Sequence, residues 1–222
     1  MKVKSLILSD LHLGASQNNA KFALEILNSY EYDNLYLLGD ILDISAMSKA
    51  YHWSEYDDNV WRKINETFTK IKTRYIIGNH ERDFPVDSYS YKYYFDSKPF
   101  YFVGKMFRDK NFLAIHGHEF DLELAEKKFP FPLGDYFNGG YGKEMLDNLC
   151  RNIRRSPEYT DLFAQKAIDI LSSTLGFGTI ICGHTHYQDY QEKGNVKYYN
   201  VGDMKTGKNF MLEHLDGTLE QM

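Results

Sequence analysis

Residues 3–12 read VKSLILSDLH, a short apolar run that stops at a serine, an aspartate and a histidine. An apolar run of this length, bounded by polar residues, is typical of a buried strand. Residues 35–40 read LYLLGD and repeat the pattern. Between the two runs, residues 19–30 carry apolar side chains at helical spacing, with Asn18 or Asn19 as the expected N-cap. The stretch therefore predicts a strand, a helix and a second strand, which is the start of an α/β fold.

The same pattern occurs three more times along the chain. A helix expected over residues 54–72 leads into an apolar run at 74–77, and further apolar runs occupy residues 111–115 and 179–182. Polar clusters follow all five expected strands, and six of the eight histidines lie in them. The clusters are Asp10-x-His12, Gly39-Asp40-x-x-Asp43, Gly78-Asn79-His80-Glu81, His116-x-His118 and Gly183-His184-x-His186.

Two other regions complete the expected organisation. Residues from about 120 to 176 contain helical patterns broken by proline and glycine, which predicts a helical cap inserted into the fold. Residues 187–222 contain short alternating runs with turn signals at Gly194-Asn195 and Asp216-Gly217, which favours antiparallel hairpins. No linker divides the chain, so we expect residues 1–222 to form one domain with mixed sheets.

Composition restricts the class of protein. The 222 residues are 43% hydrophobic and 26% charged, as in a globular domain and unlike a disordered chain. A net charge of -5 argues against stable binding of nucleic acid. Two cysteines, Cys150 and Cys182, cannot form a disulfide framework, and no segment has the length of a signal peptide core or a transmembrane helix. These features predict a cytoplasmic protein.

The polar clusters predict a metal site. Ligands bind outside the carboxyl ends of strands in open α/β sheets, so five clusters at such ends can converge. Carboxylates, an amide and several imidazoles are metal ligands, and their number suits two ions better than one. The adjacent glycines Gly39, Gly78 and Gly183 would allow close backbone approach or positive φ.

The charge of such a site suggests its substrate. Two divalent ions contribute +4 and the carboxylates of Asp10 and Asp40 return -2, leaving about +2. A positive binuclear site attracts phosphate oxygens and lowers the pKa of bound water, which suits hydrolysis of a phosphate ester or anhydride. Mixed imidazole and carboxylate ligation favours manganese, iron or zinc over magnesium, and nickel is a further candidate.

The five clusters, in this order, resemble the blocks of the calcineurin-like metallophosphoesterases. The resemblance implies a four-layer α/β/β/α sandwich and a binuclear centre in which a metal-activated water attacks phosphorus. It implies that one ion is held by Asp10, His12, Asp40 and His186. It further implies that Asp40 bridges the two ions and that Asn79, His116 and His184 complete the second site. His80 would be the catalytic proton donor or phosphate-orienting residue.

Within that family, three segments are similar to the UDP-2,3-diacylglucosamine pyrophosphatase branch of lipid A synthesis: SDLHLG at 9–14, HGHEFD at 116–121 and YYNVGD at 198–203. This likeness implies manganese dependence, release of UMP and a lipid-linked substrate. His80-Glu81 stands where well-known members carry Arg-Asp, which leaves a generic phosphomonoesterase or cyclic phosphodiesterase as the alternative. A nuclease and an inactive binding scaffold are further alternatives.

Candidate substrate contacts lie outside the ligand set. Arg151, Arg154 and Arg155 share one face of an expected helix and could bind a diphosphate or an anionic membrane surface, although exposed charge is the simpler explanation. Arg82 follows the third cluster and is a further candidate. His118 either orients a ligand or contacts substrate. The sequence does not determine the oligomeric state.

Overall fold

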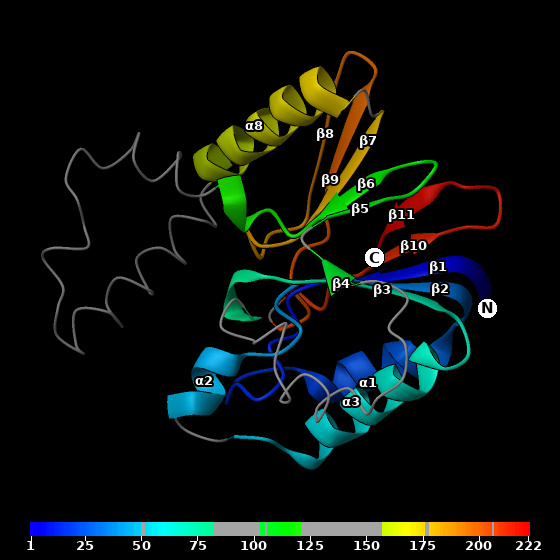
Figure 1. Ribbon diagram of the computed structural model, residues 1–222, viewed down its shortest axis with the longest axis vertical. Helices are drawn as coiled ribbons and strands as arrows, with labels where there is room; N and C mark the ends of the chain where they lie inside the picture. Colours follow the sequence, from blue (N-terminus) through cyan, green and yellow to red (C-terminus); the bar gives the residue numbers. More distant parts are fainter. Residues whose placement is uncertain (50–51, 82–102, 105, 121–156, 176–177, 206) are drawn as a thin grey trace, which may run out of the picture.

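The computed structural model describes the chain except for residues 50–51, 82–102, 105, 121–156, 176–177 and 206. Its described part consists of two stacked β-sheets with helices on their outer faces (Figure 1). Helices α1 and α3 cover the first sheet, and α8 covers the second. This is the expected α/β/β/α arrangement. The predicted cap falls mainly on residues 121–156, outside the described residues.

The first sheet has six strands in the order β11-β10-β1-β2-β3-β4. Strands β1 to β4 are parallel, while β10 is antiparallel to both β1 and β11. Their bounds are Lys2–Leu8 for β1, Glu31–Leu38 for β2, Lys72–Ile76 for β3, Val103–Gly104 for β4, Met211–Glu213 for β10 and Leu219–Gln221 for β11. The three neighbouring strands β1, β2 and β3 therefore end on the same edge of the sheet.

The second sheet has five strands in the order β5-β6-β7-β9-β8. Strands β6, β7 and β9 are parallel, and β5 and β8 are antiparallel to their neighbours. The bounds are Met106–Arg108 for β5, Leu113–Ile115 for β6, Thr179–Cys182 for β7, Asp189–Lys193 for β8 and Val196–Asn200 for β9. The two predicted hairpins, β8–β9 and β10–β11, are confirmed, but they belong to different sheets.

The two helices expected over residues 19–30 and 54–72 are present, although the second ends at Phe68 and Lys72 belongs to β3. The bounds of the helices are Ala20–Ser29 for α1, Ile44–Lys49 for α2, Glu55–Phe68 for α3 and Pro157–Leu175 for α8, with 3-10 turns η1 at Asn79–Glu81 and η2 at His118–Phe120. Helix α3 begins at a capping box in which Ser54 and Asp57 bond each other's backbone N–H. Asn19 occupies the N-cap of α1 without a side-chain bond, while the Asn18 side chain accepts the Ala20 N–H instead.

Both faces of the second half of β2, residues 35–38, are buried, which explains the continuous apolar run there. Leu35 and Leu37 pack with α1 and α3, whereas Tyr36 and Leu38 face the second sheet. The interlayer core also contains Phe112 from the second sheet. No helix within the described residues is long and apolar enough to cross a membrane.

Candidate metal centre

Segments that follow strands of both sheets meet at one place. The N–H of Asp10, after β1, donates to the Gly39 carbonyl at 3.1 Å, and the N–H of His12 donates to the Asp40 carbonyl at 2.9 Å. In the second sheet, the Gly183 N–H donates to the His116 carbonyl at 3.1 Å. The loops are thus bonded to one another, and their side chains converge as the strand-end pattern predicts.

Backbone conformation directs several of these side chains inward. Five residues of the centre have positive φ: Asp10 (53°), His12 (49°), Asp40 (51°), His184 (74°) and His186 (61°). In the described part of the chain, Lys208 is the one other non-glycine residue with positive φ. Residues with a Cβ rarely adopt this region, and such strain concentrates at functional sites. In Asp10-x-His12 and in His184-x-His186, both terminal residues have positive φ and both side chains reach the centre.

Glycines provide the space for these side chains. A Cβ on Gly78 would lie 2.1 Å from the Asp40 Oδ1 atom, and one on Gly183 would lie 2.7 Å from the Asp10 Oδ2 atom. A Cβ on Gly39, whose φ is +85°, would lie 2.5 Å from His116 Nδ1. All three contacts are shorter than real Cβ atoms show. The expected close backbone approach is therefore confirmed.

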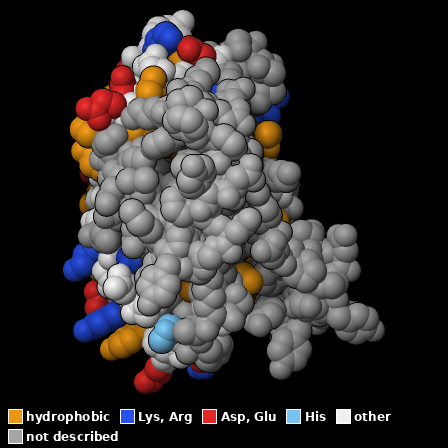
Figure 2. All heavy atoms as spheres, turned by 90° about the vertical axis from the view of Figure 1, so that its left-hand side faces the viewer, with side chains coloured by type: hydrophobic (Ala, Val, Ile, Leu, Met, Phe, Trp, Pro, Cys, Tyr) orange, Lys and Arg blue, Asp and Glu red, His pale blue; other side chains and the backbone are white. Residues whose placement is uncertain are grey.

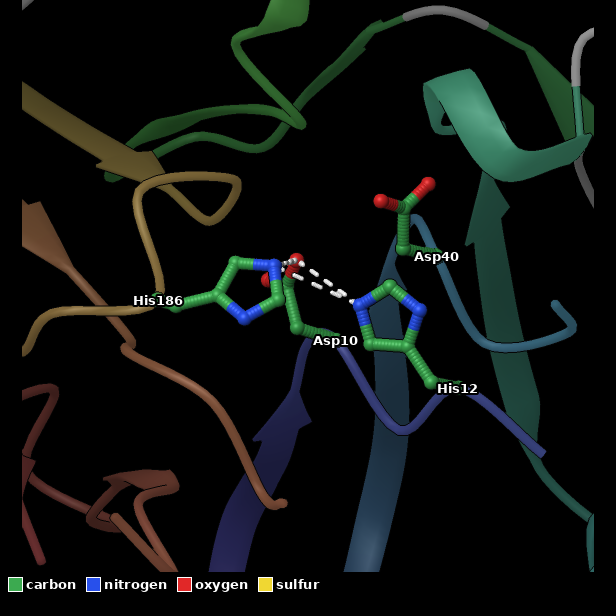
Figure 3. Close-up of side chains that lie close together, drawn as sticks. All are labelled: Asp10, His12, Asp40 and His186. Carbon is green, nitrogen blue, oxygen red and sulfur yellow. Dashed lines mark hydrogen bonds and ion pairs between the residues drawn. The ribbon is translucent and has the colours of Figure 1, made fainter. Parts of the chain in front are cut away.

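Asp10, His12, Asp40 and His186 form one group of potential ligands, with one donor atom from each within 4.8 Å of the others. Figure 3 shows the rings of His12 and His186 directed at Asp10, with Asp40 beside them. The two Nε2 atoms are 3.3 Å apart, and His186 Nε2 is 3.4 Å from Asp10 Oδ1. Two nitrogens that bind one ion at about 2.1 Å can lie no more than about 4.2 Å apart, so these separations suit a shared ion.

A second group consists of Asp40, His116 and His184. The Nε2 atom of His116 lies 3.4 Å from Asp40 Oδ2 and 3.3 Å from the Asn79 side-chain oxygen. His116 Nδ1 donates to the Leu38 carbonyl at 2.7 Å, so the Nε2 lone pair faces the group. Asp40 belongs to both groups. All seven predicted ligands are thus brought together.

One buried atom tests whether a cation fits here. Asp10 Oδ1 is inaccessible to solvent and has no hydrogen-bond partner among the described residues. Its other oxygen accepts the Ser9 hydroxyl at 2.5 Å and the His184 N–H at 3.0 Å. A buried carboxylate oxygen without a partner is costly, and a cation between Asp10 and the two imidazoles would remove that cost. The donor set therefore fits a divalent ion.

His80 lies at the rim of the centre. Its side chain is 31% exposed, against 0% for His116, and its Nδ1 atom is 2.9 Å from Asp43 Oδ1. Its Nε2 atom is 3.9 Å from Asp40 Oδ2, and its backbone N–H donates to Asp40 Oδ1 at 2.9 Å. A half-exposed imidazole in this position can reach a bound substrate.

Three buried carboxylates for which the sequence suggested no role support the centre, two of them through its histidines and one through its loops. Asp43 accepts His12 Nδ1–H at 3.2 Å as well as His80, and Asp203 accepts His186 Nδ1–H at 3.1 Å. Glu81 accepts the backbone N–H groups of Ile41, Leu42 and Gly78 and the Tyr75 hydroxyl, which fastens two loops together. All three lie in the segments that carry the family resemblance, and that resemblance was the feature of the sequence that could have identified Asp43, Glu81 and Asp203.

The electrostatics of the centre show close pairing of acid and imidazole. Burial alone would lower the pKa of His116, but the carboxylates of Asp40 and Asp10 and the Leu38 carbonyl raise it to about 10. Burial would raise the pKa of Asp40, yet the neighbouring imidazoles of His116, His12 and His80 hold it well below its usual range. Divalent ions would replace these protons, because ligand imidazoles must be neutral.

Burial, followed by the negative charge of Asp40, raises the pKa of Glu81 to about 7. His118 lies near the second group, with its ring centroid 5.5 Å from that of His116 and 6.2 Å from that of His184. This position is compatible with both roles considered for it. The other candidate substrate contacts, Arg82, Arg151, Arg154 and Arg155, lie outside the described residues.

Comparison with protein families agrees with this arrangement. The family model for calcineurin-like phosphoesterases matches residues 3–188. Similar solved structures include an archaeal phosphodiesterase (15% identity, 98% of each chain covered, TM-score 0.49) and the phosphoesterase Yfce from E. coli (16% identity, 98% of this chain and 97% of that chain, TM-score 0.49). Vps29 from Chaetomium thermophilum is also similar (10% identity, 98% and 92% covered, TM-score 0.46). No curated protein matches the sequence.

Proposed function

Because the chain belongs to the calcineurin-like phosphoesterase family, whose members hydrolyse phosphoester bonds, we propose that it is a binuclear metallophosphoesterase. The observation that carries this proposal is the position of Asp40, which is a member of both ligand groups. A carboxylate shared between two sets of donors is suited to bridge two ions. The buried oxygen of Asp10, which has no hydrogen-bond partner among the described residues, supports the same reading.

The proposed ligands divide between the two ions as the family resemblance implies. Asp10, His12, Asp40 and His186 hold the first ion, and Asp40, Asn79, His116 and His184 hold the second. When bound, the ions supply Lewis acidity toward phosphate oxygens and lower the pKa of a water molecule. Manganese is the proposed metal, since nitrogen and oxygen donors are mixed.

His80 is the proposed proton donor to the leaving oxygen. The Asp43 carboxylate accepts from its Nδ1 atom at 2.9 Å, which leaves Nε2 as the atom that faces a substrate. The same Asp43 also accepts from His12 at 3.2 Å. Asp43 therefore orients both the proposed proton donor, His80, and a proposed ligand of the first ion, His12.

The leading substrate proposal is a UDP-2,3-diacylglucosamine-type nucleotide diphosphate. Its support is the likeness of residues 9–14, 116–121 and 198–203 to that branch of the family. Hydrolysis of a small phosphomonoester or cyclic phosphodiester is the second candidate, favoured by His80 in place of the arginine. A nuclease is disfavoured by the net charge of -5. On the face shown in Figure 2, the described Lys and Arg side chains also lie among Asp and Glu side chains and form no continuous basic surface. The cytoplasm remains the proposed location.

The test combines metal analysis with a substrate comparison. Protein purified without chelator should contain about two ions per chain, whereas an inactive scaffold should contain far less. It is then incubated with Mn2+ and UDP-2,3-diacylglucosamine, with and without EDTA, while bis- and mono-p-nitrophenyl phosphate are assayed in parallel. UMP release well above the rate on the generic esters supports the lipid substrate. Metal-dependent cleavage of a nitrophenyl ester alone supports the second candidate.

Two variants separate the metal centre from the substrate question. Replacing the shared ligand, Asp40→Ala, should abolish both metal retention and turnover. Glu213→Gln changes a buried carboxyl group outside the two ligand groups and should preserve both. Full activity in Asp40→Ala would contradict the proposal.

A further inference from the structure

Asp203 lies directly behind His186. Its carboxylate is fully buried, and its Oδ2 atom accepts the Nδ1–H of His186 at 3.1 Å. The opposite ring nitrogen, Nε2, is 3.4 Å from Asp10 Oδ1 and 3.3 Å from His12 Nε2. A carboxylate can only accept from an imidazole N–H, so this contact places the proton on Nδ1 and the lone pair on Nε2.

Hydrogen bonds hold the loop that carries Asp203. Its Oδ1 atom accepts the Gly207 N–H at 2.8 Å, and its backbone carbonyl accepts the Asn209 N–H at 3.0 Å. Just before it, Gly202 has φ +77° and donates its N–H to the Asn200 side chain. The Gly207 N–H therefore orients one oxygen of the Asp203 carboxylate, and the other oxygen is left to accept from His186.

The same loop is fastened to the segment that carries His186. The Asn200 side chain donates to the Gly183 carbonyl at 2.7 Å, three residues before His186. The Val201 N–H donates to the Cys182 carbonyl at 2.8 Å, which extends the pairing of β7 with β9. Hydrogen bonds thus join the loops after β7 and β9, and Asp203 contacts His186 across this junction.

We propose that Asp203 is a positioning residue for the metal centre, which holds His186 in the Nδ1–H tautomer so that its Nε2 atom binds the first ion. The inference rests on the proposed function, because it assumes that His186 is a ligand. A carboxylate behind a ligand imidazole also increases its basicity, and removal of such partners weakens metal binding by about 10–100-fold. The expected effect is therefore on metal affinity as well as on rate.

Asp203 allows a cleaner test than Asp43. Asp43 contacts both His12 and His80, so its replacement would disturb a ligand and the proposed proton donor together. Within the described residues, Asp203 bonds one proposed ligand histidine, His186. His116 offers no comparable test, because its Nδ1–H is held by the backbone carbonyl of Leu38, which a substitution does not remove. A change at Asp203 should therefore act on the first ion through His186.

The conservative variant Asp203→Asn makes the prediction specific. Both carboxylate oxygens of Asp203 accept an N–H, and an amide offers one accepting oxygen only. The amide NH2 must face either Gly207 N–H or His186 Nδ1. If the NH2 group faces Gly207, the hydrogen bond to the loop is lost. If it faces His186, it donates to Nδ1, so the proton of His186 moves to Nε2, where it blocks the ion.

The experiment measures Mn2+ binding to the full chain after EDTA stripping, with free Mn2+ followed by EPR. The wild-type protein should bind two ions, and Asp203→Asn should bind one of them about 10–100-fold more weakly. Glu213→Gln is the matched control, because it also neutralises a buried carboxylate with several hydrogen bonds but contacts none of the proposed ligands. The melting temperature of each variant in EDTA reports any general loss of stability.

A double variant identifies the path of the effect. In a His186→Ala background, Asp203→Asn should change Mn2+ affinity by less than about 2-fold, because its partner is already absent. An Asp203→Ala protein, which offers His186 no acceptor in any orientation, would overturn the proposal if it bound both ions as tightly as the wild type. A wild-type chain that binds no Mn2+ would instead overturn the proposed function.

A measurement on the wild-type chain covers the case in which Asp203→Asn does not fold. Protein labelled with 15N-histidine and loaded with Zn2+ should show His186 protonated at Nδ1 and without a proton at Nε2, the signals being assigned by comparison with His186→Gln. Protonation of His186 at Nε2 in the metal-loaded protein would contradict the inference.

Discussion

Two buried carboxylates lie beside strand β1, and they differ in how their oxygens are used. Glu213 is 1% exposed, and its oxygens accept from Lys4 Nζ at 2.6 Å, from the Ser5 hydroxyl at 2.5 Å and from Asn111 at 3.3 Å. Asp10, at the end of the strand, is 0% exposed and leaves Oδ1 without a hydrogen-bond partner among the described residues. A satisfied buried acid stabilises the fold, whereas an unsatisfied one indicates a place for a ligand.

The largest effect expected from this comparison is that of Asp10→Asn. The amide can still accept from Ser9 or His184, but the charge and the open oxygen are lost. Metal retention should fail at the first site, and activity should fall by well over 100-fold, since loss of a ligand exceeds loss of its outer partner. Metal analysis and turnover on bis-p-nitrophenyl phosphate measure the two effects. The melting temperature in EDTA should not fall, and a large decrease would show that Asp10 is structural like Glu213.

His80→Ala should leave the metal content unchanged and lower the rate. General acid catalysis contributes about 10²–10⁴-fold, and the loss should fall in kcat on an ester with a poor leaving group. The loss should be smaller for a nitrophenyl ester, whose leaving group needs no proton. Loss of ions from this variant would move His80 into the ligand set.

Removal of metal should change the stability of the wild-type chain more than that of Asp10→Asn. Each ion, at 100 times its dissociation constant, stabilises the folded state by about 2.7 kcal/mol, which in a chain of this size raises the melting temperature by about 5–10 °C per site. Calorimetry with Mn2+ and with EDTA measures the difference. Equal shifts in the two proteins would contradict the assignment of Asp10 as a ligand.

The smallest effect is expected at the other carboxylate. Glu213→Ala leaves Ser5 and Lys4 without their acceptor and should lower the free energy of unfolding by about 1–3 kcal/mol. Urea denaturation in EDTA measures this loss. Metal affinity should stay at the wild-type value, and a coupled loss of both would remove the distinction between the two carboxylates.

The sequence pattern was sufficient to predict which side chains converge, because local chemistry and position agree there. Each apolar run ends at the residues that the structure brings together, and β1, β2 and β3 are parallel neighbours, so their carboxyl ends must meet. The start of β2 was predicted too late, at Leu35 instead of Glu31. The first half of β2 alternates exposed and half-buried side chains, so it has no apolar run that would predict a strand. Its strand conformation depends instead on pairing with β1.

Other features depend on contacts between distant parts of the chain. Asp203 and His186 are 17 residues apart, and Asp43 and His12 are 31 residues apart, so no spacing rule connects them. The placement of the two hairpins in different sheets is likewise set by pairing of β10 with β1 and of β9 with β7. The six-residue helix α2 begins beside Asp43, which accepts the Ala46 N–H, and is too short for a periodic signal.

The membership of Asp40 in both ligand groups has a consequence for protein engineering. Any attempt to change the metal preference of one site alone must keep this residue, because a softer or larger side chain there would alter the other site as well. The residues that belong to one group only can be changed independently, such as His186 in the first and His184 in the second. Gly78 restricts the choice further, since its missing Cβ is the space that the Asp40 carboxylate occupies. A redesigned centre would therefore vary the outer donors and retain the pair of Asp40 and Gly78.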